Sequence, residues 1–282
     1  MSLLLAFALM IPPSPNAVVI KPVANMYSAP SEDADVVSQG IFGSSVVLVE
    51  EKGAWAKVRT GDDYTGWMLL AALRRYSGAD HVYASTGPVA QVENLFANVY
   101  REPNVTKHQP VLTLPFGARL EVVVAPENDS GHWLKVRLPD GSSAWVQRGD
   151  VNLNPRPLSV KETIQLAKRF LGLTYLWGGS SSFGFDCSGF TQMLVSRRGI
   201  VMPRDADVQA AWAGVVPVKR TKLQAGDLLF FGESPQRITH TGMYIGHGKF
   251  IHDTTHEHPG VQISCLADEH WTKLLVACRR LK

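Results

Sequence analysis

The first half of this 282-residue chain contains one sequence pattern twice, in copies about 75 residues apart. The recurring motifs are Ala-Asn-Met-Tyr (24–27) and Ala-Asn-Val-Tyr (97–100), Phe-Gly (42–43 and 116–117), Trp-Ala-Lys-Val-Arg (55–59) and Trp-Leu-Lys-Val-Arg (133–137), and Gly-Trp-Met (66–68) and Ala-Trp-Val (144–146). In each copy, short alternating runs are separated by Gly, Asp and Pro, which is typical of antiparallel strands joined by turns. We therefore predict two small all-β barrels. Residues 1–80 contain the N-terminal segment and the first barrel, and residues 81–155 contain the second.

The second half changes to a helical pattern. Residues 154–157, Asn-Pro-Arg-Pro, interrupt regular structure and mark the boundary. Ser159 and Glu162 then form a capping-box pattern, and apolar residues at helical spacing predict a helix that ends at Gly172. The elements predicted next are a helix up to residue 199, a helix near 205–212 and strands from residue 228 onward. Helices first and strands later predict an α+β, papain-like domain over residues 156–282.

Composition argues against several classes of function. The net charge of +3 is small, and no run of Lys and Arg with interleaved aromatic residues occurs, so nucleic-acid binding is not expected. Only three cysteines are present, too few for a disulfide framework, and we expect Cys265 and Cys278 to be buried as small apolar residues. The histidines at 247, 252, 256 and 258 lack the spacing of a zinc site, so neither a metal nor another cofactor is expected.

Residues 2–11 are apolar but too few for a membrane span, and they lack the basic residues that begin a signal peptide. No cysteine follows them, which argues against a lipoprotein anchor. We expect this segment to pack on the folded body of a monomeric, cytoplasmic protein with no stable membrane span. The alternative is a degenerate secretion signal, which would make the protein periplasmic or secreted.

A cysteine at the start of a predicted helix is the centre of the candidate site. The unpaired N–H groups and the dipole of the helix are expected to lower the pKa of Cys187, and the thiolate is the nucleophilic form. His240 opens one predicted strand and His252 ends the next, so one sheet carries both imidazoles. This is the layout of a thiol peptidase, in which His240 takes the proton of Cys187 and His252 orients His240. A buried cysteine without a catalytic role is the alternative.

Five motifs in this half resemble the NlpC/p-60 family of bacterial cell-wall cysteine peptidases, from about residue 159 to the C-terminus. They are Tyr-Leu-Trp-Gly-Gly (175–179), Asp-Cys-Ser-Gly-Phe (186–190), Pro-Arg-Asp (203–205), Gly-Asp-Leu (226–228) and His-Thr-Gly-Met-Tyr-Ile-Gly (240–246). The two β copies resemble bacterial SH3-like domains. The backbone N–H of Cys187 is a natural donor to the oxyanion of the reaction, and the family resemblance implies that the Tyr175 hydroxyl is a second one.

Asp186 is expected to oppose thiolate formation at Cys187, because like charges repel. A cationic substrate group would relieve this repulsion, and a free amino terminus bound by Asp186 and Ser188 is such a group. The chain thus resembles the subgroup whose SH3-like domains restrict the peptidase to stem peptides beginning with free L-alanine. In that subgroup a tyrosine and an acidic residue of the first barrel close the amine pocket, which points to Tyr64 and Glu32. The alternative role of Asp186 is a helix cap.

The same resemblance implies further substrate contacts. Trp177 is expected to bind substrate, and Arg204 with Asp205 is expected to lie at the D-glutamate of the substrate, where a guanidinium can fork onto a carboxylate. Many relatives carry serine where this chain has Ala206, so one hydrogen bond is not expected here. A surface salt bridge is the alternative role of Arg204.

Together with these residues, the family resemblance implies a cysteine endopeptidase for the bond between γ-D-Glu and an L-diamino acid, meso-diaminopimelate or Lys. Its partners would be peptidoglycan-derived stem peptides with free N-terminal L-Ala, in murein recycling or cell-wall turnover. Two alternatives remain open. One is a non-catalytic peptidoglycan-binding protein, and the other is an amidase or acyltransferase that uses the same cysteine and histidine.

Overall fold

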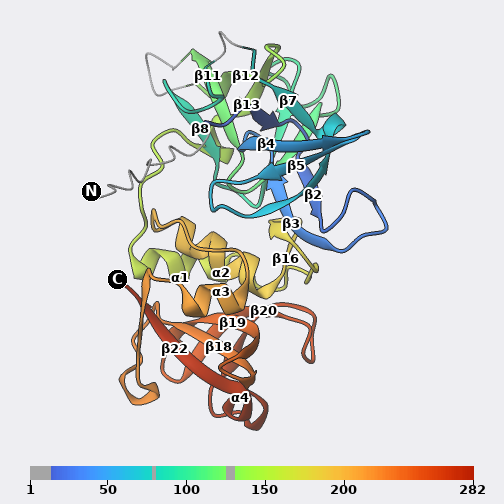
Figure 1. The fold of residues 1–282 in the computed structure, drawn as a ribbon. Coiled ribbons are helices and arrows are strands. Elements are labelled where there is room, and N and C mark those ends of the chain that lie inside the picture. Colours follow the sequence, from blue (N-terminus) through green and yellow to red (C-terminus); the bar gives the residue numbers. More distant parts are fainter. Residues whose placement is uncertain (1–13, 78–80, 125–130) are drawn as a thin grey trace, which may run out of the picture.

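The computed structural model describes residues 14–77, 81–124 and 131–282 (Figure 1). The apolar segment 2–11, which we expected to pack on the folded body, lies outside these ranges. None of the helices in the described ranges has the length and apolar character needed to cross a membrane.

The first repeat forms a seven-stranded antiparallel sheet, residues 17–75, which we call the first barrel. Its strands are β1 (Ala17–Val19), β2 (Val23–Tyr27), β3 (Val36–Ile41), β4 (Ser45–Lys52), β5 (Trp55–Arg59), β6 (Thr65–Leu69) and β7 (Leu73–Arg75), with the short helix η1 (Leu70–Ala72) before β7. Alternate residues point inward, as the period of a strand requires, so Ala56 and Val58 of β5 are fully buried between half-buried neighbours. Met26 and Met68 fill the same core.

The second repeat, residues 89–152, forms the second barrel with the same topology. Its strands are β8 (Val89–Val92), β9 (Phe96–Tyr100), β10 (Leu112–Pro115), β11 (Arg119–Val124), β12 (Trp133–Arg137), β13 (Ser143–Gln147) and β14 (Val151–Asn152), with η2 (Arg148–Asp150) before β14. The strand orders, β3-β2-β6-β5-β4-β1-β7 and β10-β9-β13-β12-β11-β8-β14, correspond strand by strand. The two copies of the sequence pattern therefore fold into two barrels with the same strand topology. Val18 and Phe42 of the first barrel join the core of the second, so the two barrels pack together.

The C-terminal region confirms the α+β prediction. Its elements are α1 (Val160–Lys168), β15 (Ser180–Ser181), β16 (Gly184–Phe185), α2 (Cys187–Ser196), α3 (Ala206–Ala211), β17 (Val215–Pro217), η3 (Arg220–Lys222), β18 (Leu228–Ser234), β19 (Arg237–Gly246), β20 (Lys249–Thr254), β21 (Gly260–Cys265), α4 (Glu269–Leu274) and β22 (Leu275–Leu281). Six strands form one sheet in the order β17-β22-β18-β19-β20-β21. Helices α1 to α3 lie between this sheet and the barrels, and α4 lies on the far side (Figure 1).

Helix α1 begins with the predicted capping box, in which Ser159 and Glu162 satisfy each other's backbone N–H groups. The helix ends at Lys168, earlier than the predicted Gly172. The reason is tertiary, because the N–H of Gly172 donates to the carbonyl of Val261 on β21 and draws the chain toward the sheet.

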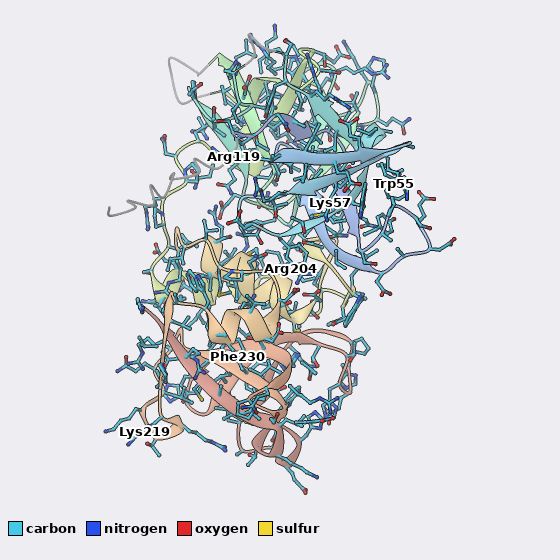
Figure 2. All side chains as sticks on the ribbon, in the orientation of Figure 1. Trp55, Lys57, Arg119, Arg204, Lys219 and Phe230 are labelled. Atoms are coloured by element: carbon cyan, nitrogen blue, oxygen red, sulfur yellow. The ribbon has the colours of Figure 1, made fainter. Side chains whose placement is uncertain are left out.

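Strand β3 of the first barrel lies against the loop that leads into α2. Gly178 has φ +72°, and a Cβ on it would lie 2.4 Å from the carbonyl oxygen of Val36, so only glycine fits there. The N–H of Ser180 donates to Gln39 at 3.0 Å. Figure 2 shows that the side chain of Arg204 lies between the barrels and the sheet that contains Phe230. The first barrel therefore borders the start of α2.

Candidate active site

Cys187 is the first residue of α2, as the sequence predicted. The helix is capped by Asp186, whose carboxylate accepts a hydrogen bond from the N–H of Gly189 at 2.7 Å. The Sγ atom of Cys187 lies 4.0 Å from the carbonyl oxygen of Thr239 on β19, to which the thiol can donate. Burial, followed by the charge of Asp186, raises the pKa of Cys187 to about 12. The predicted lowering of this pKa was wrong, because desolvation outweighs the helix dipole, and the resting sulfur is a thiol.

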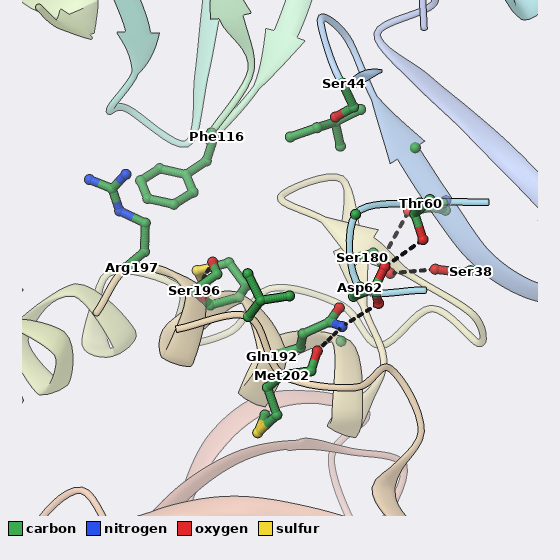
Figure 3. A pocket seen from close by; sticks show the side chains of 18 of the residues that line it. Ser38, Ser44, Thr60, Asp62, Phe116, Ser180, Gln192, Ser196, Arg197 and Met202 are labelled. Carbon is green, nitrogen blue, oxygen red and sulfur yellow. Dashed lines mark hydrogen bonds between the residues drawn. The ribbon is translucent and has the colours of Figure 1, made fainter. Parts of the chain in front are cut away.

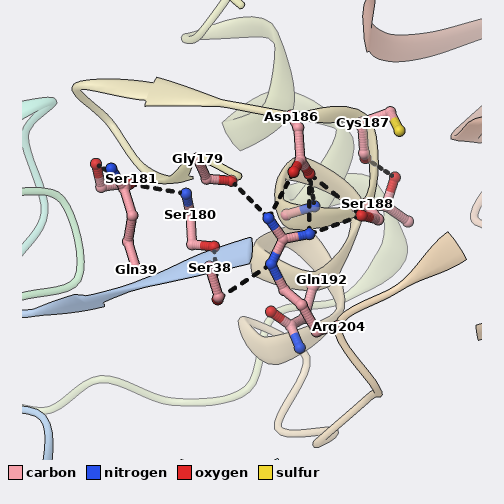
Figure 4. Close-up of polar contacts among 12 residues, drawn as sticks. Ser38, Gln39, Gly179, Ser180, Ser181, Asp186, Cys187, Ser188, Gln192 and Arg204 are labelled. Carbon is pink, nitrogen blue, oxygen red and sulfur yellow. Dashed lines mark hydrogen bonds and ion pairs between the residues drawn. The ribbon is translucent and has the colours of Figure 1, made fainter. Parts of the chain in front are cut away.

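Arg204 is buried and directs all five of its N–H donors to protein atoms (Figure 4). Its Nη1 donates to Oδ1 of Asp186 at 3.0 Å and to the hydroxyl of Ser188 at 2.7 Å. Its Nη2 donates to Oδ2 of Asp186 at 2.5 Å and to the carbonyl of Gly179 at 3.3 Å. Its Nε donates to the hydroxyl of Ser38 on β3, at 3.2 Å. The pair of Asp186 and Arg204 is thus a bidentate ion pair with every guanidinium donor occupied.

This ion pair corrects two expectations. We expected a substrate amine to relieve the repulsion between Asp186 and the thiolate, whereas Arg204 of the protein itself neutralises Asp186. We also expected Arg204 to bind a substrate carboxylate, or else to form a surface salt bridge. The side chain is 2% exposed and has no free donor, so it holds the floor of the site instead. Removal of one partner of such a pair leaves a buried charge and costs about 3–5 kcal/mol.

His240 of β19 and His252 of β20 form a chain of hydrogen bonds. Nε2 of His240 lies 2.7 Å from Nδ1 of His252, and Nε2 of His252 lies 3.0 Å from the hydroxyl of Ser264 on β21. The ring of Trp271 stacks on His240 with a centroid distance of 5.2 Å. Burial lowers the pKa of His240 to about 3 and also lowers that of His252, so both rings are neutral at pH 7. With Nε2 of His240 engaged, Nδ1 is the nitrogen free to accept a proton.

A cleft of about 500 Å³ lies over the start of α2. Tyr175 and Trp177 line one wall, and Trp177 is 70% exposed, so its ring is open to a ligand. Burial, followed by the charge that develops at Cys187, raises the pKa of Tyr175. Its hydroxyl therefore stays protonated and can donate a hydrogen bond to an oxyanion.

The first barrel forms another wall of this cleft. Tyr64 lines the cleft together with Asp205, which precedes α3. Burial, followed by the charge of Asp205, raises the pKa of Tyr64 to about 12. Glu32, our candidate for the acidic residue, is exposed and is not part of the cleft lining. Asp35 takes that place, because the chain turns at residues 31–34 and brings Asp35 to the start of β3.

The charges that line the cleft are predominantly negative. Asp35, Asp205 and Asp207 line it, and the cation among the lining residues, Arg204, is already neutralised by Asp186. Burial raises the pKa of Asp205, which shows that its charge lacks full compensation. A cationic ligand group is therefore complementary to this cleft.

Comparison with known proteins places this geometry in a family. Residues 172–280 match the model of the NlpC/P60 family, residues 26–73 that of the bacterial dipeptidyl-peptidase Sh3 domain, and residues 81–152 that of the GW (Gly-Tryp) dipeptide domain. A gamma-D-glutamyl-L-lysine dipeptidyl-peptidase of Bacillus subtilis is 32% identical over 258 residues, which cover 88% of this chain and 82% of that protein. The chain belongs to the NlpC/P60 family.

A second NlpC/P60 relative, a gamma-D-glutamyl-L-lysine dipeptidyl-peptidase of Bacillus cereus, is 33% identical over 231 residues. The alignment covers 76% of this chain and 66% of that protein. A crystal structure of an NlpC/P60 family protein from Bacillus cereus superposes with a TM-score of 0.81 at 27% identity, over 94% of this chain and 99% of the other. Membership in the NlpC/P60 family makes the protein a cysteine peptidase with SH3-type barrels before the catalytic domain.

Sequence reasoning missed two residues of this site. Ser264 completes the hydrogen-bond chain behind His252, yet only the register of β20 against β21 brings the two side chains together. Asp35 lines the cleft in place of Glu32, and the loop before β3 carries no local signal that distinguishes these two acids. The sequence could have suggested a polar partner for His252 on the strand that follows it, as Ser264 is. The choice between Asp35 and Glu32 depends on the three-dimensional structure of the loop.

Proposed function

We propose that the protein hydrolyses the bond between γ-D-Glu and the L-diamino acid, Lys or meso-diaminopimelate, of stem peptides with a free N-terminal L-Ala. The activity named for the two Bacillus relatives supports the choice of bond. Such peptides are soluble fragments of peptidoglycan, which fits a role in murein peptide recycling in the cytoplasm.

The observation that carries this proposal is the wall that the first barrel adds to the cleft. Asp35 and Tyr64 reach the cleft from the barrel, and Asp205 faces them from the catalytic domain. An ammonium group is complementary to two carboxylates and a phenolic oxygen. An acylated or sugar-linked alanine has no positive charge to offer there and is bulkier, so the wall discriminates against it.

The proposed chemistry starts from a neutral thiol and a neutral imidazole. Sγ of Cys187 attacks the γ-carbonyl carbon of D-Glu while Nδ1 of His240 accepts the thiol proton. The oxyanion accepts hydrogen bonds from the N–H of Cys187 and the hydroxyl of Tyr175. Collapse breaks the C–N bond, and the imidazolium of His240 gives its proton to the leaving amine. Water, deprotonated by the same ring, then hydrolyses the thioester.

Burial keeps both the thiol of Cys187 and the imidazole of His240 neutral at rest. It also accounts for the hydrogen bonds that join His240 to His252 and Ser264. An imidazolium in this apolar setting needs an acceptor for its Nε2–H, and Nδ1 of His252 lies 2.7 Å away to accept it. The hydroxyl of Ser264 fixes the tautomer of His252 by accepting its Nε2–H. In this mechanism His252 acts by positioning and stabilising His240.

The proposal is tested by comparing L-Ala-γ-D-Glu-L-Lys with its N-acetylated form. The free peptide should yield L-Ala-γ-D-Glu and lysine by mass spectrometry, and kcat/KM for the acetylated peptide should be at least about 100-fold lower, the loss expected for one charge-assisted contact and a steric clash. Equal turnover of both peptides would refute the selection for a free amine. Cleavage at another bond, or transfer to an added amine in place of hydrolysis, would favour amidase or acyltransferase chemistry.

A further inference from the structure

The turn that carries Tyr64 has a well-defined conformation. The N–H of Thr60 donates to the carbonyl of Tyr64 at 2.9 Å, and the N–H of Asp63 donates to the carbonyl of Thr60 at 3.0 Å. The hydroxyl of Thr60 donates to Oδ1 of Asp62, and Asp63 has φ +63°. Internal bonds thus set the shape of the turn, residues 60–64, but they do not set its position over the catalytic domain.

One amide group connects this turn to the catalytic helix. Nε2 of Gln192, on α2, donates to Oδ2 of Asp62 at 2.8 Å and to the carbonyl of Met202 at 2.8 Å (Figure 3). Both N–H groups of the amide are therefore used. Within residues 14–77, 81–124 and 131–282, the bond to Asp62 is the one hydrogen bond between the turn and α2.

Packing does not hold the turn against α2 at this point. Asp62, Gln192 and Met202 line a cavity of about 320 Å³ between the first barrel and the back of α2 (Figure 3). Atoms across an unfilled space gain little dispersion energy, so the polar link is the main local restraint on the turn. The other partner of Gln192, the segment 202–205, is held a second time, because the amide of Gln209 donates to the carbonyls of Pro203 and Arg204.

We propose that Gln192 is a positioning residue for substrate selection, which fixes Tyr64 against Asp205 and so sets the width of the amine pocket. Asp62 lies two residues before Tyr64, and Met202 lies three residues before Asp205. The amide of Gln192 therefore links the segment that carries Tyr64 to the segment that carries Asp205. This inference rests on the proposed selection for a free amino terminus. It assigns Gln192 no contact with substrate, since the residue acts through the turn.

The experiment exchanges the two linked groups. Gln192→Glu places a carboxylate against Asp62 and against the carbonyl of Met202, and it repels the turn. The double variant Asp62→Asn with Gln192→Glu restores a donor and an acceptor in swapped positions at the same net charge. Asp63→Asn is the matched control for the Asp62→Asn substitution, because it also removes one negative charge from the turn. Asparagine tolerates the positive φ at this position. Steady-state kinetics on L-Ala-γ-D-Glu-L-Lys and its N-acetyl form are measured for each protein, and thermal melting shows that each is folded.

Gln192→Glu should raise KM for the free peptide about tenfold, with kcat within about twofold of the parent, because the pocket but not the chemistry is disturbed. The double variant should recover most of this loss, as coupled groups do in a mutant cycle. Asp63→Asn should behave like the parent. An unchanged KM, a fall in kcat alone, or no recovery in the double variant would overturn the role of Gln192 while the parent's preference for free amines stands. Loss of that preference in the parent itself would remove the proposed function as well.

Discussion

The two barrels share one topology and one turn, yet among the residues that the structure describes only those of the first barrel line the cleft. In the first barrel, residues 60–64 close with the bonds from Thr60 N–H to Tyr64 and from Asp63 N–H to Thr60. In the second, residues 138–142 close in the same way, with Leu138 N–H bonded to Ser142 and Gly141 N–H bonded to Leu138. The positions of Asp63 and Gly141 both have positive φ. The last residue differs, being a tyrosine in one copy and a serine in the other.

The second barrel meets the catalytic domain on a different side. Its Phe116 packs on Phe170 after α1 with a ring distance of 5.4 Å, and its Glu93 forms an ion pair with Arg197 at the end of α2. Its turn instead faces the first barrel, where Arg74 donates to the carbonyl of Pro139. Identical local structure thus supports two uses, a wall of the cleft and a supporting contact, and the docking geometry decides between them.

In this comparison the barrels shape the cleft or support it, and the proposed catalytic groups lie in the C-terminal domain, outside both barrels. Cys187→Ala should therefore lower kcat at least about 1000-fold, because it removes the proposed nucleophile. Cys265→Ala, which removes a free thiol on β21, should stay within about twofold of the parent. Measured turnover of L-Ala-γ-D-Glu-L-Lys checks both. A nearly active Cys187→Ala protein would mean that the reaction occurs elsewhere.

The next test of the comparison exchanges the last residues of the two turns, Tyr64 and Ser142. Tyr64→Ser should lower kcat/KM for the free peptide about 10–100-fold, because the aromatic wall of the cleft and its phenolic oxygen are both lost. Ser142→Tyr, in the second barrel, should have no effect on the same constant. Comparable losses from both substitutions would show that the two barrels do not differ in function.

The acidic residue of the first barrel gives a smaller effect. Asp35→Asn should raise KM for the free peptide about 3–10-fold, and the effect should shrink at high salt, because the carboxylate acts by attraction across an open cleft. The matched control Glu32→Gln changes the neighbouring acid that lies outside the cleft. If Glu32→Gln gave the larger rise in KM, the structural assignment of Asp35 would be incorrect.

Stability offers the last contrast, between a buried acid of the second barrel and one of the catalytic domain. Glu121 accepts hydrogen bonds from the N–H of Ala84 and from His81. Asp253, beside His252 on β20, is buried with neither carboxylate oxygen hydrogen-bonded among the described residues, and burial, followed by the charge of Asp186, raises its pKa to about 8. The folded state therefore holds a proton on Asp253 more tightly than the unfolded state does.

A raised carboxyl pKa means that stability falls as pH rises from about 4 to about 8, by up to about 1.4 kcal/mol per pH unit. Asp253→Asn removes this dependence, so its melting temperature should gain on the parent between pH 5 and pH 8. Glu121→Gln should instead lower the melting temperature by a few degrees, since it weakens a partnered group. A constant difference between Asp253→Asn and the parent across this pH range would contradict the raised pKa.

Much of the fold could be predicted because its signals are local. The repeat, the capping box at Ser159 and the helix start at Cys187 depend on residues close together in the chain, and each was found where expected. The pKa of Cys187 could not be predicted in this way. The helix dipole acts locally and favours the thiolate, whereas the burial that outweighs it depends on β19 and on the surrounding fold.

By itself, the sequence determined the modules, their order and the residue types that carry the chemistry, since period, capping and motif spacing are properties of neighbouring residues. Only the tertiary structure decided how Asp186 is neutralised, which acid of the first barrel reaches the cleft, and which of two equivalent turns closes it. Each of these depends on the distance between groups from separate modules. Electrostatic and packing energies follow that distance, and it is set by how the barrels dock on the helices.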